Sequence, residues 1–88
     1  MTQQELNEEV HRRPFRPFRI VLTTGEAYDV HHPDLIMVGN LSLVIGLTND
    51  PQGTAFDRIV RADLFHVVRT EELPTTVPPT GNGQGQQS

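Results

Sequence analysis

Short runs in which apolar and polar residues alternate make up most of the chain, a pattern typical of half-buried β-strands. In residues 16–23, Phe18, Ile20 and Leu22 fall on one face of an extended segment. The TTGE segment that follows is suited to a tight reversal, because glycine and threonine are common turn residues. The pattern therefore predicts a first strand at 16–23 and a second strand returning beside it.

The predicted second strand is interrupted by a proline. Tyr28 and Val30 share one face of this strand, and Asp29 and His31 share the other. Pro33 cannot donate a hydrogen bond to a neighbouring strand, so we expect a corner or bulge in the His-Pro-Asp stretch. The pattern predicts three later strands, at 41–47, 56–61 and 66–70. A polar loop separates the first two of these, and a helical turn at 62–65 precedes the last.

Five short strands of this kind predict a mainly β fold, a small antiparallel five-stranded barrel with an N-terminal helix. Large apolar residues at every second position of 41–47 should point inward, namely Leu41, Leu43, Ile45 and Leu47.

The first residues have the features of one short helix. Thr2 and Glu5 fit a capping box, and Leu6 and Val10 lie four positions apart, so they share a helix face. We expect a helix over residues 3–12 that docks its apolar face on the barrel or on another subunit, because so short a helix is marginal alone in water.

A change of composition divides the chain into two parts. Residues 74–88 read PTTVPPTGNGQGQQS, with one valine and no charged side chain. Such a segment cannot offset the entropy lost on folding. We therefore predict one domain at 1–73 and a disordered tail at 74–88.

Composition restricts the function classes. The chain has 88 residues, no cysteine and a net charge of −4, which argues against disulfides, thiolate metal sites and generic polyanion binding. The polar, acidic N-terminus is unlike a signal peptide and no stretch is long and apolar enough to span a membrane, so we expect a cytoplasmic protein. A domain this small buries only about 60% of its unfolded surface, so self-association is expected to add stability.

The order of predicted elements over residues 3–72 resembles the Sm-like and SH3-like small barrels. The segments PFRPFRIVLTTGEAYDVHHPDLIMVG and ADLFHVVRTE are also similar to a group of small uncharacterised bacterial proteins, a similarity that implies no activity. The Sm-like resemblance implies a ring that binds uridine-rich RNA through a loop asparagine. Asn40 lies in such a turn, and Val38 stands where the accompanying aspartate of that family would be.

Arginines cluster at the start of the predicted barrel and are the main candidate binding residues. All seven basic residues are arginine, and four of them lie within eight positions and alternate with aromatic rings. Guanidinium groups beside aromatic faces suit phosphate or carboxylate recognition and base stacking. The structural alternative is pairing with nearby glutamates, with the phenylalanines in the core. The candidate binding residues are Arg12, Arg13, Arg16, Arg19 and Phe15.

The histidines offer weaker chemistry. His31, His32 and Asp34 are the densest group of potential metal ligands, but adjacent histidines on a regular strand face opposite sides of the sheet. We therefore predict no metal site and no cofactor. Asp29 and His31 could form a base and its orienting carboxylate, yet no nucleophile accompanies them, so we predict no catalytic residues.

These patterns together favour a non-enzymatic interaction module that acts through self-association and binding of a protein partner. The alternative is an RNA-binding Sm-like oligomer that uses the Arg/Phe surface. A small hydrolase or a metal-binding protein is the second alternative, and no small-molecule substrate is indicated.

Overall fold

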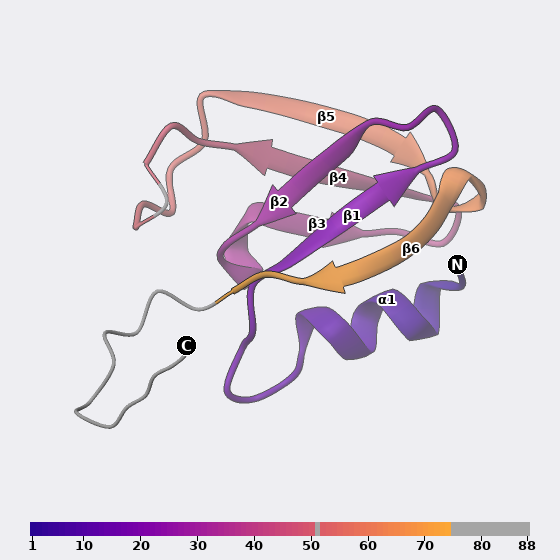
Figure 1. The fold of residues 1–88 in the computed structure, drawn as a ribbon, viewed down its shortest axis with the longest axis horizontal. Helices are drawn as coiled ribbons and strands as arrows, with labels where there is room; N and C mark the ends of the chain where they lie inside the picture. The colour runs from indigo at the N-terminus through magenta and orange to yellow at the C-terminus, as the bar shows by residue number, and fades with distance from the viewer. Residues whose placement is uncertain (51, 75–88) are drawn as a thin grey trace.

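The computed structural model describes residues 1–50 and 52–74, in which one helix packs against two small β-sheets (Figure 1). The elements in chain order are α1 (Gln3–Val10), β1 (Phe18–Leu22), β2 (Ala27–Val30), the 3-10 turn η1 (Pro33–Leu35), β3 (Ile36–Val38), β4 (Ser42–Leu47), β5 (Arg58–Asp63), the 3-10 turn η2 (Leu64–His66) and β6 (Val67–Glu72).

The first sheet has the order β2-β1-β6, and all its pairings are antiparallel. Phe18 and Ile20 of β1 are fully buried, and Phe18 lies opposite Val30 of β2 in the ladder. Gly25, in the turn between β1 and β2, has a φ of 91°, a left-handed conformation that glycine adopts without strain. The alternation of 16–23 therefore predicts this strand and its buried face correctly.

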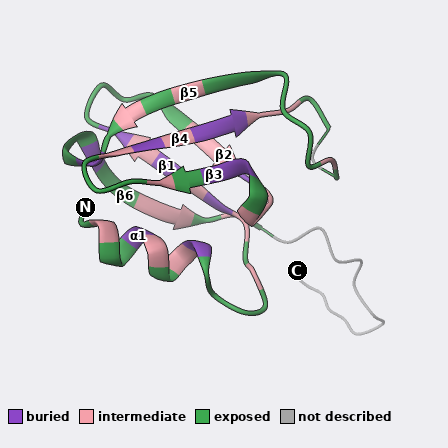
Figure 2. Cartoon of the chain, turned by 180° about the vertical axis from the view of Figure 1, so that it is seen from behind, coloured by how far each residue is buried: buried purple, intermediate pink, exposed green. Residues whose placement is uncertain are grey.

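The second sheet has the order β3-β4-β5 and is also antiparallel. Ile36 lies opposite Ile45, and Ile45 lies opposite Val60, so these side chains point to the same side of the sheet. Ile36, Ile45 and Leu43 are buried in the core, and Figure 2 shows buried residues along β4.

The mainly β prediction with an N-terminal helix is confirmed, but a closed five-stranded barrel is not. Among the described residues there are six strands in two three-stranded sheets. The difference arises at η1, because the predicted corner at Pro33 ends β2 in one sheet and starts β3 in the other. A strand expected to bend is thus divided between two sheets.

Leu41 was expected in the core, and this prediction is wrong. Its side chain is 81% exposed, whereas Leu43 and Ile45 are buried and Leu47 is half-buried. The strand begins only at Ser42, and the carbonyl of Leu41 accepts a hydrogen bond from the N–H of Leu64 in η2. Leu41 therefore lies in the connection before β4, where the alternation of buried and exposed strand positions does not apply.

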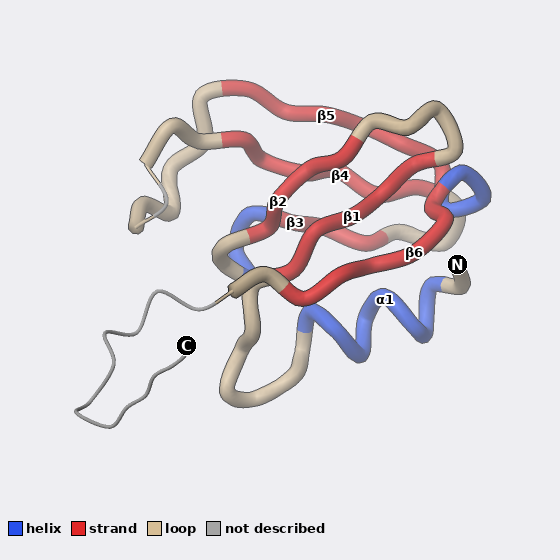
Figure 3. The backbone as a smooth tube through the Cα atoms, in the orientation of Figure 1, coloured by secondary structure: helices blue, strands red, loops and turns tan. Residues whose placement is uncertain are grey.

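The helix lies beside the two sheet edges formed by β6 and β3, where Figure 3 shows it running beneath both strands. Leu6 and Val10 are buried there, as their spacing predicts. The capping box is present, since the backbone N–H of Glu5 donates to Thr2 Oγ1 and the N–H of Thr2 donates to Glu5 Oε1. The helix ends at Val10, earlier than predicted, because residues 12–14 no longer follow a helical path.

The last two strands lie one or two residues later than predicted. The expected strand at 56–61 is β5 (Arg58–Asp63), and the one at 66–70 is β6 (Val67–Glu72). The helical turn is present as η2, at 64–66 where 62–65 was expected. The predicted tail at 74–88 lies, except for Pro74, outside the described residues.

Candidate functional site

The outer face of the second sheet carries apolar side chains where water-facing polar ones are expected. Side chains alternate across a strand, so Met37 and Val44, which lie opposite one another, point away from the core. Met37 is 68% exposed and Ile59 is 57% exposed. Single exposed apolar residues are ordinary, but a contiguous group indicates a binding surface.

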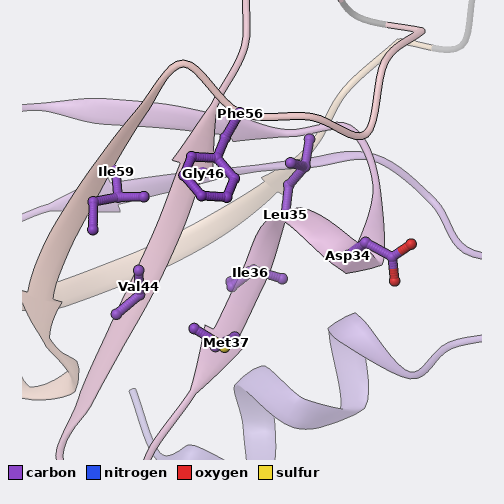
Figure 4. A pocket seen from close by; sticks show the side chains of 8 residues that line it. All are labelled: Asp34, Leu35, Ile36, Met37, Val44, Gly46, Phe56 and Ile59. Atoms are coloured by element: carbon purple, nitrogen blue, oxygen red, sulfur yellow. The ribbon is translucent and has the colours of Figure 1, made fainter.

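These side chains border a shallow hollow of about 250 Å³ (Figure 4). The lining is almost wholly apolar, and three strands and two connections contribute to it. The lining residues are Asp34, Leu35, Ile36, Met37, Val44, Gly46, Phe56 and Ile59. We call this group the outer-face hollow.

Gly46 forms part of the floor of the outer-face hollow, and its missing side chain gives the hollow its shape. A Cβ atom on Gly46 would lie 3.0 Å from the Cβ of Phe56 and 3.3 Å from Cδ2 of Leu35. Phe56 can therefore pack directly against the backbone of β4 only because residue 46 is glycine.

Two charged residues flank the hollow. Asp34 lines it at the η1 end, and Figure 4 shows its carboxylate on the side away from Ile59. Arg61 lies on β5 directly opposite Val44, with its side chain on the outer face. Both are exposed, and neither takes part in an ion pair within the described part of the chain.

The predicted arginine cluster is brought together but largely neutralised by carboxylates. Arg12 and Arg16 both donate to Oε2 of Glu72, at 3.4 and 3.2 Å. Arg12 also pairs with Glu9 at 3.1 Å. The structural alternative, pairing of Arg12 with a helix glutamate, is thus present, together with a contact to the end of β6 that the sequence spacing could not reveal.

Arg19 and Asp29 form a cross-strand ion pair on the first sheet. Arg19 Nε donates to Asp29 Oδ1 at 2.7 Å, and its terminal nitrogen donates to Oδ2 at 3.4 Å. The hydrogen bond and charge of Asp29 raise the pKa of the Arg19 guanidinium above its ordinary value. The carboxylate suggested as an orienting group for His31 is therefore held by Arg19.

Arg13 and Phe15 have different surroundings. The Arg13 guanidinium donates to the backbone carbonyls of Val10 and Arg12, and the ion pairs among the described residues do not include it. Phe15 is half-buried and lies 6.0 Å, centroid to centroid, from the ring of Phe18. Phe15 is thus partly a core residue rather than a free stacking platform.

The histidine corner does not assemble a metal site in the part of the chain that the structure describes. No group of three or more histidine, cysteine, aspartate or glutamate side chains lies close enough to hold an ion there. His31 and His32 are half-buried and Asp34 is exposed at the outer-face hollow. These residues stay weak candidates for ligands.

A second apolar group lies away from the hollow. Phe65 is 88% exposed on η2, and it lies near Leu41 because Leu64 hydrogen bonds to the Leu41 carbonyl. Sequence reasoning missed both apolar groups. One signal in the sequence could have indicated the hollow. Strand alternation places large apolar residues such as Met37 and Ile59 on the outward side of their strands, where polar residues are expected.

In residues 1–50 and 52–74 there is no helix with the length and apolar character needed to cross a membrane. Comparisons with protein-family models, curated proteins and solved structures gave no match. Function is therefore inferred from the surface chemistry alone.

Proposed function

We propose that the chain is a non-enzymatic interaction module that self-associates and binds protein partners through the outer face of β3, β4 and β5. The observation that supports this proposal is the outer-face hollow with its exposed rim of Met37, Phe56 and Ile59. Removing such a surface from water is favourable by roughly 25 cal/mol per Å² of apolar area.

We assign the fold to the Sm-like or SH3-like small barrels within the same proposal. The ladders run β6-β1-β2 in one sheet and β3-β4-β5 in the other, with η2 directly before the last strand. If β2 and β3 are counted as one strand interrupted at η1, the chain follows the five-strand order expected for these folds. The edge of β5, on the side of the second sheet away from the helix, would offer further pairing positions for a partner strand.

RNA binding by the Arg/Phe segment is the alternative function. The ion pairs of Arg12 and Arg16 with Glu72, and of Arg19 with Asp29, weigh against it, because neutralised guanidinium groups contribute less to phosphate binding. Reversing Arg16 and Arg19 to glutamate should abolish RNA binding and its salt dependence if this alternative holds. Unchanged binding would exclude it.

The proposed function is tested by a photo-crosslinking amino acid at position 59, on the outer face, in cells that produce the protein. We expect discrete adducts, with a second copy or with another protein, that disappear when Met37→Asp is added. The matched control carries the crosslinker at Thr24, an exposed position on the β1–β2 turn. Absence of adducts at position 59, or equal adducts at position 24, would contradict the proposal.

A further inference from the structure

We propose that the occupant of the outer-face hollow is a second copy of this chain, packed face to face so that Asp34 of each copy meets Arg61 of the other. This inference rests on the proposed function, because it names the partner for the same surface. It specifies a two-fold, isologous contact in which each residue pair occurs twice.

The positions of the two charges are suited to such symmetry. In the ladders, Met37, Val44 and Arg61 form one row across the outer face. Asp34 lies in η1, just before β3, at the other end of the hollow; β3 is the edge strand opposite β5, which carries Arg61. The acid and the base therefore lie at diagonally opposite corners of an apolar centre.

A two-fold axis that lies in the contact plane, crosses the hollow and runs perpendicular to the diagonal between Asp34 and Arg61 exchanges these two corners between the copies. Asp34 then meets Arg61 of the second copy, and Arg61 meets its Asp34. The apolar centre, around Val44 and Gly46, meets its own copy on the axis. The face is thus complementary to itself in both charge and polarity.

The free side chains of Asp34 and Arg61 favour a second copy over a purely apolar partner. A charged group that is covered without a partner loses its hydration and receives nothing in return. Neither residue has an ion-pair partner in the described part of its own chain. A second copy supplies both missing partners at once.

The proposal is tested by sedimentation equilibrium of the purified protein over a range of concentrations. We expect a reversible dimer of twice 9.9 kDa. Asp34→Arg or Arg61→Asp alone should weaken it about tenfold or more, because each substitution places two like-charged pairs in the contact. The double variant, with both substitutions in one chain, should dimerise within about threefold of the unchanged protein.

Mixing the two single variants gives the sharpest test. One copy then carries only cations at the two positions and the other only anions. An equimolar mixture should therefore form a heterodimer at concentrations where each weakened variant alone is mostly monomeric. Only an isologous contact between these two positions predicts this recovery. Far-ultraviolet circular dichroism should be unchanged in every variant, since both positions are exposed.

Phe65→Asp is the matched control, because it removes an exposed apolar residue outside the hollow and should leave the dimer intact. A dimer lost in Phe65→Asp but unaffected by the charge substitutions would overturn the inference in favour of a contact through η2. A monomer at all concentrations would also overturn it. If the crosslinker at position 59 still forms adducts with other proteins, the proposed function survives that result; if it forms none, both fail.

Discussion

Gly46 is the residue on which the shape of the outer-face hollow depends most directly. Its backbone conformation is open to any residue, so the requirement for glycine is one of space. The 3.0 Å contact that a Cβ atom here would make with the Cβ of Phe56 is tighter than nine in ten such contacts in proteins, so Phe56 would have to shift. The hollow and the packing of Phe56 are therefore linked through a single position.

We expect Gly46→Ala to lower the free energy of unfolding by about 1 to 3 kcal/mol, because the new methyl group overpacks against Phe56 and Leu35. Urea denaturation measures this loss. In a chain that also carries Phe56→Gly, the nearest clashing atom is absent, so the same substitution should cost less. Equal costs in both backgrounds would show that the contact with Phe56 is not the cause.

The pair of Arg19 and Asp29 contributes modestly to stability. Both side chains are partly exposed, at 43% and 36%, so solvent screens their attraction. We expect Asp29→Asn to lower the midpoint of urea denaturation only slightly, with the difference shrinking as salt is raised. A large loss of stability that does not respond to salt would contradict this prediction.

At this scale the sequence predicts buried residues well and surface partners poorly. Phe18, Ile20 and Leu43 follow from alternation, because burial depends on direction along one strand. The contact of Arg16 with Glu72 joins residues 56 positions apart, so no local spacing could indicate it. The hollow was missed for the same reason, since it requires the register of three strands.

Among the elements, α1 is defined by signals in its own sequence, but its apolar face is buried only by contact with the sheets. The capping box fixes where it begins, and the buried positions Leu6 and Val10 fix which face docks. Thr2→Ala removes the cap hydroxyl, and we expect a loss of about 1 kcal/mol in the free energy of unfolding. Thr2→Ser is the matched control and should be nearly neutral; equal losses in both would argue against the cap.

The same cap makes the helix sensitive to acid. The backbone N–H of Thr2 chiefly, and its hydroxyl second, hold the pKa of the Glu5 carboxyl below its ordinary value. A group with a lowered folded pKa stabilises the fold above its unfolded pKa, and this stabilisation is lost as pH falls through the folded pKa. We expect an NMR titration of Glu5 to show the lowered value, rising part of the way back in Thr2→Ala.

The number and grouping of strands illustrate the limit of element-level reasoning. Pro33 was a clear sign that the second strand is interrupted. Whether the chain then bends within one sheet or passes to another depends on which neighbour is available to pair. Here β3 pairs with β4, which follows it after a connection of three residues (39–41), and β2 is left paired with β1 alone within its sheet.

Across the whole molecule, the helix completes a core that two three-stranded sheets leave open at one side. Leu6 is fully buried in the cluster that includes Phe18 and Ile45. We expect Leu6→Ala to lower the free energy of unfolding by about 2 to 5 kcal/mol, since it deletes buried methyl groups and leaves a cavity. Leu41→Ala is the matched control, because it removes the same atoms from an exposed site. It should change the free energy of unfolding by no more than about 0.5 kcal/mol.

The overall class of the fold was predictable because alternation, turns and a capped helix all act locally and agree. The candidate binding surface was less predictable, since the outer-face hollow and its flanking charges exist only after β3, β4 and β5 have paired. The arginine cluster is visible in the sequence because its members are neighbours along the chain. Glu72, which pairs with Arg12 and Arg16 in space, lies more than 50 positions away in the sequence.

The pairing of β1 with β6 has a consequence for the synthesis of this protein. The first strand to be made acquires its second neighbour only when the last strand is made, so the sheet that buries Phe18 cannot be completed on a partial chain. A ribosome paused before residue 67 would present an unpaired strand edge beside uncovered apolar side chains, a state prone to aggregation. The domain therefore completes its fold only after β6 has been made, and we expect chaperones on nascent chains that stall before β6.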